Sequence, residues 1–215
     1  MDVARETITD AYRAEQQKLH GNKRYGVASL TYAPLVSKLL KIGNCHSLSD
    51  YGAGKCNLKV ALGLRDGGPL AYQPYDPAFP EYGEPRPADL VTCIDVLEHI
   101  EPDLLDNVLD ELSAITRKLV FLTVHTRPAK KVLSDGRNAH LIQEPPSWWV
   151  DRLTTRFEIL HLQAVPKGFF MIGGRKHGYA ELAESVDLEK LGAVAGRAQV
   201  RSKTLKRRLK VLLGR

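Results

Sequence analysis

A turn with two glycines, placed between an apolar stretch and a helix, constrains this chain more than any other feature. The pattern is Asp50-x-Gly52-x-Gly54. It predicts a strand over 46–51, a tight turn, and a helix over about 55–62. Glycine has no Cβ, so the backbone bends sharply there and approaches a ligand closely, and the helix directs unbonded N–H groups at the same point. The stretch predicts a cradle for a nucleoside-bearing cofactor, although Gly-x-Gly also occurs in ordinary turns.

Acids stand at the ends of three predicted strands. Asp50 is the second-last residue of the stretch 46–51, and Asp76 and Asp95 directly follow the stretches 70–75 and 88–94. Parallel sheets bind ligands beyond the carboxyl ends of their strands. Three acids at one sheet edge therefore favour the cofactor interpretation over an ordinary turn.

The rest of the pattern predicts an α/β fold. A helix with one apolar stripe is expected over 102–117, and a continuously apolar strand over 119–124, as in a sheet covered on both faces. Strands over 157–165 and 168–173 flank a predicted turn and form a hairpin. We expect a Rossmann-like, doubly wound, mostly parallel sheet with a C-terminal antiparallel hairpin strand.

The chain divides into four expected parts: a helical cap over 1–44, a core over 45–176, a helical linker over 177–200 and a basic amphipathic tail over 201–215. Residues 18–25 of the cap act either as a lid over the cofactor or as a helix end. No apolar run is long enough to span a bilayer. Three scattered cysteines suggest neither zinc nor disulfides, so a reducing, cytoplasmic setting is expected.

The positive charge belongs mainly to the tail. The chain has a net charge of +6, and residues 201–215 contain seven Lys or Arg and no acid, so the body is close to neutral. Leucines at helical spacing in this tail predict an interfacial helix on an anionic membrane surface, which would put the protein at the inner membrane face. The alternatives are an acidic partner, a nucleic-acid backbone, or a solvated terminus.

Together these motifs resemble the class I S-adenosylmethionine-dependent methyltransferases over residues 45–175. The resemblance is carried by Asp50-x-Gly52-x-Gly54, by Asp76, and by the block Asp95-Val-Leu-Glu-His99, which is most similar to the ubiquinone-type O-methyltransferase branch. It implies that S-adenosyl-L-methionine is the cofactor. It also implies these cofactor-binding residues: Asp50, Gly52, Gly54, Asp76, Asp95 and Val96. Asp76 would hold both ribose hydroxyls, and Asp95 with Val96 would flank the methionyl sulfonium.

Two departures from that family stand out. Cys56 occupies a position that is often glycine, and the interval from Asp76 to Asp89 is too short for a helix and a strand. The sheet should therefore be shortened around the usual third strand, and the adenine contact would then fall to Phe79 or Tyr82. A dinucleotide-binding domain is the nearest alternative, but Gly-x-Gly-x-x-Gly is absent.

Two histidines are candidates for a catalytic base. His99 follows the strand whose end would face the methyl group, and His140 lies in the long loop 125–146 above the same edge. An imidazole suits proton abstraction near neutral pH. Either histidine has a plainer interpretation, as a hydrogen-bonding helix start or a solvated loop residue. No metal site is expected, because the spacing of His125 and His140 matches no metal motif.

Three residues of that loop are candidate substrate contacts: Arg127, Arg137 and Asn138. Guanidinium groups bind carboxylate or phosphate well, which suggests an anionic acceptor. We therefore expect O-methylation of a small or glycan-type acceptor. The alternatives are an RNA methyltransferase that uses the basic tail, and a non-catalytic partner module with the methyltransferase fold.

Overall fold

The computed structural model describes residues 6–22 and 25–198, and the predicted basic tail over 201–215 lies outside them. A six-stranded mixed sheet, in the order β2-β1-β3-β4-β6-β5, forms its centre. The strands are β1 (Ser47–Tyr51), β2 (Ala71–Tyr75), β3 (Ala88–Ile94), β4 (Thr116–His125), β5 (Phe157–Val165) and β6 (Gly168–Arg175). The α-helices are α1 (Asp10–His20), α2 (Ala28–Ile42), α3 (Asn57–Ala61), α4 (Leu105–Ile115), α5 (Pro146–Leu153) and α6 (Tyr179–Ser185), and residues 188–198 are also helical.

The sheet topology confirms the predicted fold class. β2, β1, β3 and β4 run parallel, whereas β6 pairs antiparallel with both β4 and β5. Between β2 and β3 the described chain has only a single 3₁₀ turn, Pro80–Tyr82, because proline interrupts regular helix there. β2 is therefore an edge strand, and the sheet is shortened as expected.

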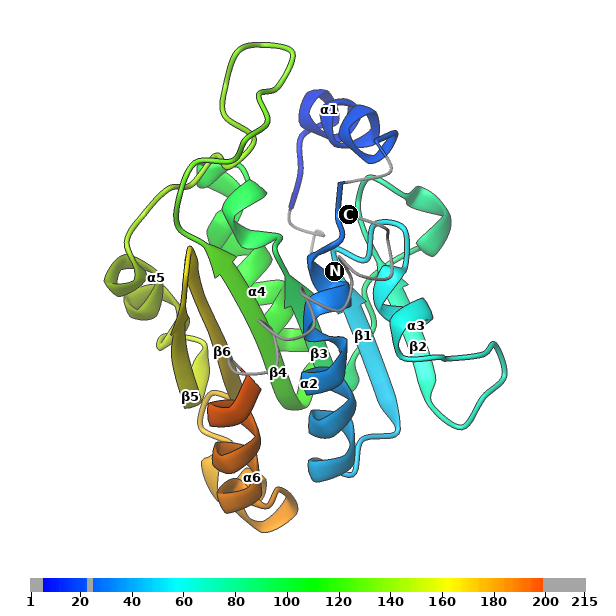
Figure 1. Ribbon diagram of the computed structural model, residues 1–215, viewed down its shortest axis with the longest axis vertical. Coiled ribbons are helices and arrows are strands. Elements are labelled where there is room, and N and C mark those ends of the chain that lie inside the picture. The colour runs from blue at the N-terminus through cyan, green and yellow to red at the C-terminus, as the bar shows by residue number, and fades with distance from the viewer. Residues whose placement is uncertain (1–5, 23–24, 199–215) are drawn as a thin grey trace, which may run out of the picture.

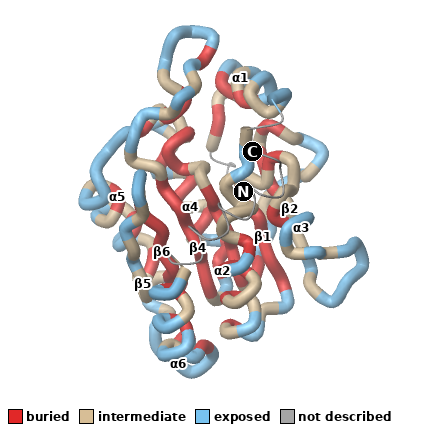
Figure 2. The backbone as a smooth tube through the Cα atoms, in the orientation of Figure 1, coloured by how far each residue is buried: buried red, intermediate tan, exposed pale blue. Residues whose placement is uncertain are grey.

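Helices cover both faces of the sheet (Figure 1). One core packs α4 and α5 against β3 and β4, and includes Leu109 and Trp149. The other packs α2, α3 and α6 against the opposite face, and includes Leu39 and Phe121. The central strands are accordingly buried along their length, while the loops at the sheet ends are exposed (Figure 2).

The first helix lies over the carboxyl edge of the sheet rather than on a face (Figure 1). Its N-cap is Thr9, whose side chain accepts a hydrogen bond from the N–H of Tyr12. Thr9 also donates to both carboxylate oxygens of Glu101, at 2.8 and 2.9 Å, and so ties the helix to the loop after β3. Among the described residues, no helix is both long and apolar enough to cross a membrane. The expected division into cap, core, linker and tail stays a prediction.

The helix after the glycine turn is shorter than expected. Cys56 adopts a left-handed conformation with φ +54°, so α3 begins only at Asn57. A residue with a side chain thus stands in a conformation that suits glycine.

Candidate active site

A cavity of about 960 Å³ opens at the carboxyl edge of the sheet. It lies among the end of α1, the start of α2, the ends of the strands and the loop after β4. Eight residues predicted from the sequence line it: Asp50, Gly52, Gly54, Asp76, Asp95, Val96, His99 and His140. The volume is at the upper end of the range for small-molecule sites. The structure thus brings the predicted cofactor and base residues to one place.

The glycine turn packs tightly against the end of β3. Gly52 has φ +75°, and a Cβ at this position would lie 2.3 Å from Cγ2 of Val96. The N–H groups of Gly52 and Ala53 both donate to the carbonyl oxygen of Tyr75, at 2.8 and 3.0 Å. These bonds fix the turn beside the end of β2, where Asp76 begins the next loop.

Asp76 is buried and held from both sides. Its Oδ2 accepts from the N–H of Gly54 and its Oδ1 from the N–H of Ala78, each at 2.9 Å. Each oxygen therefore keeps a lone pair for another donor. Burial raises the pKa of Asp76, and the two backbone N–H groups oppose that rise. A carboxylate oriented in this way suits two hydroxyl donors of a sugar.

Asp50 is used within the sheet. Its Oδ2 accepts from the hydroxyl of Tyr72 at 2.6 Å, and its Oδ1 from the hydroxyl of Thr92 at 3.0 Å. Burial raises its pKa to about 6. The side chain joins three strands beneath the cavity, and its assignment as a cofactor contact stays a prediction.

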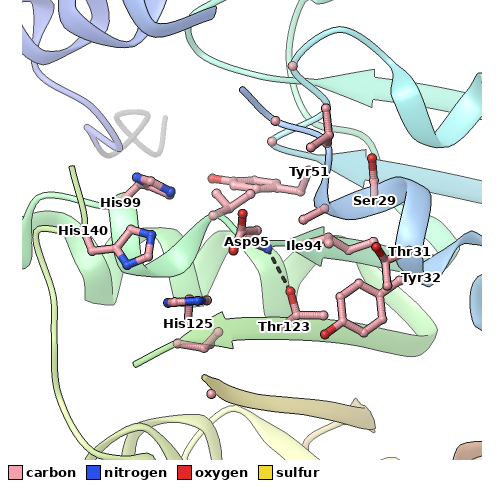
Figure 3. A pocket seen from close by; sticks show the side chains of 18 of the residues that line it. Ser29, Thr31, Tyr32, Tyr51, Ile94, Asp95, His99, Thr123, His125 and His140 are labelled. Atoms are coloured by element: carbon pink, nitrogen blue, oxygen red, sulfur yellow. Dashed lines mark hydrogen bonds between the residues drawn. The ribbon is translucent and has the colours of Figure 1, made fainter. Parts of the chain in front are cut away.

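Asp95 lies at the centre of the site in a strained conformation. Its φ is +61°, which is uncommon for a residue other than glycine. Its N–H donates to Oγ1 of Thr123 at 2.9 Å (Figure 3). Strained backbone of this kind concentrates at functional sites, and here it ends β3 and directs the chain toward His99.

His99 and His140 each use one ring nitrogen in a hydrogen bond, and the other ring nitrogen has no hydrogen-bond partner in the part of the chain that the structure describes. Nδ1 of His99 donates to the carbonyl oxygen of Ala139 at 2.7 Å, and Nδ1 of His140 to that of Arg127 at 2.6 Å. A carbonyl oxygen only accepts, so the proton of each neutral ring is on Nδ1. Nε2 of each ring then has a lone pair available to take a proton.

The two histidines form a row with His125 beside Asp95 (Figure 3). The ring centroids of His99 and His140 are 4.8 Å apart, and those of His140 and His125 are 4.9 Å apart. Burial, with the charge of His140, lowers the pKa of His99 to about 4, and burial also lowers the pKa of His140. Both rings are therefore neutral near pH 7, as a general base requires.

Glu98 was not among the residues predicted from the sequence, although it stands inside the motif before His99. It is fully buried, and its Oε1 accepts from the N–H of His125 at 2.7 Å. Burial, with the nearby charge of Asp95, raises its pKa. Glu98 thus positions the backbone at the end of β4, and its place within the motif was the only signal for it.

The three predicted substrate contacts do not line the cavity within the described part of the chain. Arg127 is exposed and supplies the carbonyl that fixes His140. Arg137 is exposed and pairs with Asp135 at 2.7 Å. Oδ1 of Asn138 accepts from the N–H groups of Ala129 and His140, so this side chain shapes the loop. Their role in substrate binding stays a prediction.

Other cations line the cavity instead. They are Lys38, Lys130, Lys131, Lys167 and Arg197, and none of the five forms an ion pair with an acid in the part of the chain that the structure describes.

The suggested adenine contacts, Phe79 and Tyr82, stack on each other at 5.4 Å and are not among the lining residues. Within residues 6–22 and 25–198, no group of three or more His, Cys, Asp or Glu side chains is arranged to hold a metal ion.

Comparison with known proteins supports the fold. No protein-family model and no curated protein matches the chain. A solved structure of 1,6-didemethyltoxoflavin-N1-methyltransferase from Burkholderia thailandensis, with bound 1,6-didemethyltoxoflavin and S-adenosylhomocysteine, aligns with a TM-score of 0.53 at 14% identity, over 80% of this chain and 92% of that chain. A structure of DhpI in complex with SAH aligns with a TM-score of 0.51 at 14% identity, over 77% of this chain and 93% of that chain.

A weaker match is an O-methyltransferase family protein from Burkholderia thailandensis, with a TM-score of 0.49 and 13% identity over 79% of this chain. The chain spans 60% of the length of that protein. At these identities the likeness concerns the fold. The chain therefore has a methyltransferase-like Rossmann fold and is structurally similar to the class I S-adenosylmethionine-dependent methyltransferases.

Proposed function

We propose that this protein is an S-adenosylmethionine-dependent methyltransferase that acts on an oxygen of a small anionic acceptor. The observation that carries the proposal is one cavity that joins the glycine turn and Asp76 to two neutral histidines with open Nε2 atoms. The block Asp95-Val-Leu-Glu-His99 resembles the ubiquinone-type O-methyltransferase branch, and this resemblance supports the proposal.

The residues on the cofactor side fit a nucleoside with an amino-acid chain. Asp76 keeps one lone pair on each oxygen for ribose hydroxyls. Gly52 and Gly54 have no side chains, so Val96 packs directly on Gly52 and the His20 ring directly on Gly54, and the turn stays narrow beside Asp76. When bound, S-adenosylmethionine supplies an activated methyl group.

The chain's own residues then orient the acceptor and remove its proton. We place the acceptor hydroxyl between Asp95 and the row of histidines (Figure 3), where Nε2 of His99 or His140 would take its proton. Either ring can accept the proton because its Nδ1–H is already committed to a carbonyl oxygen. Positioning and proton removal are the contributions that a protein makes to such a displacement.

Cations that form no ion pair with an acid among the described residues support an anionic acceptor, although one of them, Lys131, lies over the ring of Tyr25. Lys130, Lys131 and Lys167 line the cavity. Burial is the main cause that lowers the pKa of His140, and the positive charge of Lys167 lowers it further. Acidic sugars and small hydroxy acids are the two acceptor classes to test first.

The test is transfer of a radiolabelled methyl group to hydroxy acids, acidic sugars and their neutral analogues. We expect label on the oxygen of an anionic acceptor, with kcat reduced about 100-fold by His99→Gln or His140→Gln. Equal labelling of neutral analogues would contradict the anionic acceptor. Label found on nitrogen or carbon would contradict O-methylation.

A further inference from the structure

His20 projects from the end of α1 onto the glycine turn. Its ring packs edge-on against Tyr25 and Phe79, with centroids 5.0 Å away in both cases. A Cβ on Gly54 would lie 2.7 Å from Cε1 of His20, so the ring rests on the bare glycine backbone. The side chain is only 11% exposed, and the residue lines the cavity.

The surroundings of His20 determine where its proton is. Nδ1 is buried and has no hydrogen-bond partner among the described residues, whereas Nε2 lies 4.0 Å from Oδ2 of Asp76. Burial, with the charge of Lys55, lowers the His20 pKa to about 4, so the ring is neutral and has one N–H. The carboxylate favours that proton on Nε2, which makes Nε2–H a donor next to Asp76.

The distance between these two atoms suggests a shared ligand. At 4.0 Å they are too far apart for a direct hydrogen bond. A single oxygen placed between them can lie within hydrogen-bond distance of both. A hydroxyl fits this position because it accepts from Nε2–H and donates to the carboxylate.

We propose that His20 is a further cofactor-binding residue, whose Nε2–H donates to the same ribose hydroxyl that donates to Asp76. This inference rests on the proposed function, because it assigns one more contact to the nucleoside of that cofactor. From the sequence, His20 belonged only to a segment that was either a lid or a helix end.

The attachment of α1 supports this role. Nε2 of Gln17 donates to the carbonyl of Ala78 at 3.1 Å, and the N–H of Ala78 donates to Oδ1 of Asp76. Nζ of Lys55 donates to the carbonyl of Asn22 at 2.7 Å. The end of α1 is thus bonded to both loops that form the nucleoside cradle.

Two His20 variants test the proposal by calorimetric titration. His20→Phe keeps a ring between Tyr25 and Phe79 but removes the N–H, and His20→Gln returns an N–H donor. We expect His20→Phe to weaken binding of S-adenosylhomocysteine and of 5′-methylthioadenosine by about 3- to 10-fold, and His20→Gln to recover part of the loss. The control is His46→Phe, at an exposed position outside the cavity.

Equal or tighter binding by His20→Phe, with the wild type binding normally, overturns this inference alone. Failure of the wild type to bind S-adenosylhomocysteine overturns the proposed function instead. A double-mutant cycle with Asp76→Asn adds a second test. If both residues hold one hydroxyl, the combined loss is smaller than the product of the separate losses, and a fully multiplicative loss contradicts the shared contact.

Discussion

At the scale of single residues, Gly52 sets how closely the glycine turn approaches the end of β3. Its φ of +75° and the 2.3 Å between an added Cβ and Val96 give two separate reasons against any side chain. Gly52→Ala should lower the free energy of unfolding by about 2–4 kcal/mol, from left-handed strain and overpacking. Urea unfolding measures this loss.

Gly63 is the matched control. It has a similar φ of +67°, but nothing lies within 4 Å of an added Cβ, so Gly63→Ala should lose only about 1 kcal/mol from strain. Equal losses of unfolding free energy in the two variants would show that crowding against Val96 does not contribute to the loss in Gly52→Ala. Val96→Ala should recover part of the Gly52→Ala loss.

The depressed pKa of His99 makes a prediction about pH. With its pKa near 4 in the folded protein and about 6.5 when unfolded, the unfolded state binds more protons between these values. The contribution of neutral His99 is thus fully present above pH 6.5 and is lost as pH falls toward 4. The wild type should lose up to about 3 kcal/mol of stability relative to His99→Gln over that range.

The comparison with His99→Gln is needed because Asp50, whose pKa is raised to about 6, acts in the opposite direction. Denaturant unfolding of both proteins at pH 7, 5.5 and 4 gives the difference. A difference that does not change with pH would mean that His99 is not buried as a neutral ring. For catalysis the same pKa predicts a rate that rises with pH near 4 and is level above about 6.

At the scale of elements, the loop 125–146 holds His140 through Asn138. The amide of Asn138 bonds the N–H and carbonyl of Ala129 and the N–H of His140, at 2.9 to 3.0 Å. Asn138→Ala should release His140 and lower kcat about 10-fold or more. Binding of S-adenosylhomocysteine should be unchanged, because the glycine turn and Asp76 are not touched.

Arg137→Ala is the control for that loop, because Arg137 is exposed and its side chain contacts Asp135 and the ring of Tyr12 rather than His140. A higher KM for the acceptor in Arg137→Ala, with no effect of Asn138→Ala, would contradict this account. Arg137 would then be a substrate contact, as the sequence predicts, and Asn138 would not position His140. Hydrogen exchange over 125–146 reports loosening of the loop directly.

The order and type of these elements were predictable from the sequence, because apolar runs, glycines and prolines act locally. The meeting of Asp76, Asp95 and His99 also followed, since carboxyl ends of parallel strands share one edge. The hydrogen-bond partners of the site residues could not be predicted from the sequence. Those of Asp50, for example, lie on the neighbouring strands β2 and β3. His20 was missed because its contact with Asp76 depends on how α1 docks.

At the scale of the whole molecule, five cations surround a cavity that also contains the predicted base. Lys167→Gln should raise KM for an anionic acceptor by about 2- to 5-fold, because it removes from the cavity wall a positive charge that no acid of the described residues pairs with. A neutral analogue should show no change. Lys41→Gln, an exposed position outside the cavity, is the matched control.

Equal effects of Lys167→Gln on charged and neutral acceptors would contradict recognition of an anion at this wall. The basic residues at 201–215 are a separate question, and binding of an anionic surface or acidic partner by them stays a prediction.

The central claim is that this fold binds S-adenosylmethionine through Asp76. Calorimetric titration with S-adenosylhomocysteine tests it most directly, in the wild type, in Asp76→Asn and in the exposed control Asp103→Asn. We predict saturable binding by the wild type and the control, and at least about 10-fold weaker binding by Asp76→Asn, since a hydrogen-bonded charge is removed. No binding by the wild type, or equal binding by Asp76→Asn, would contradict the account.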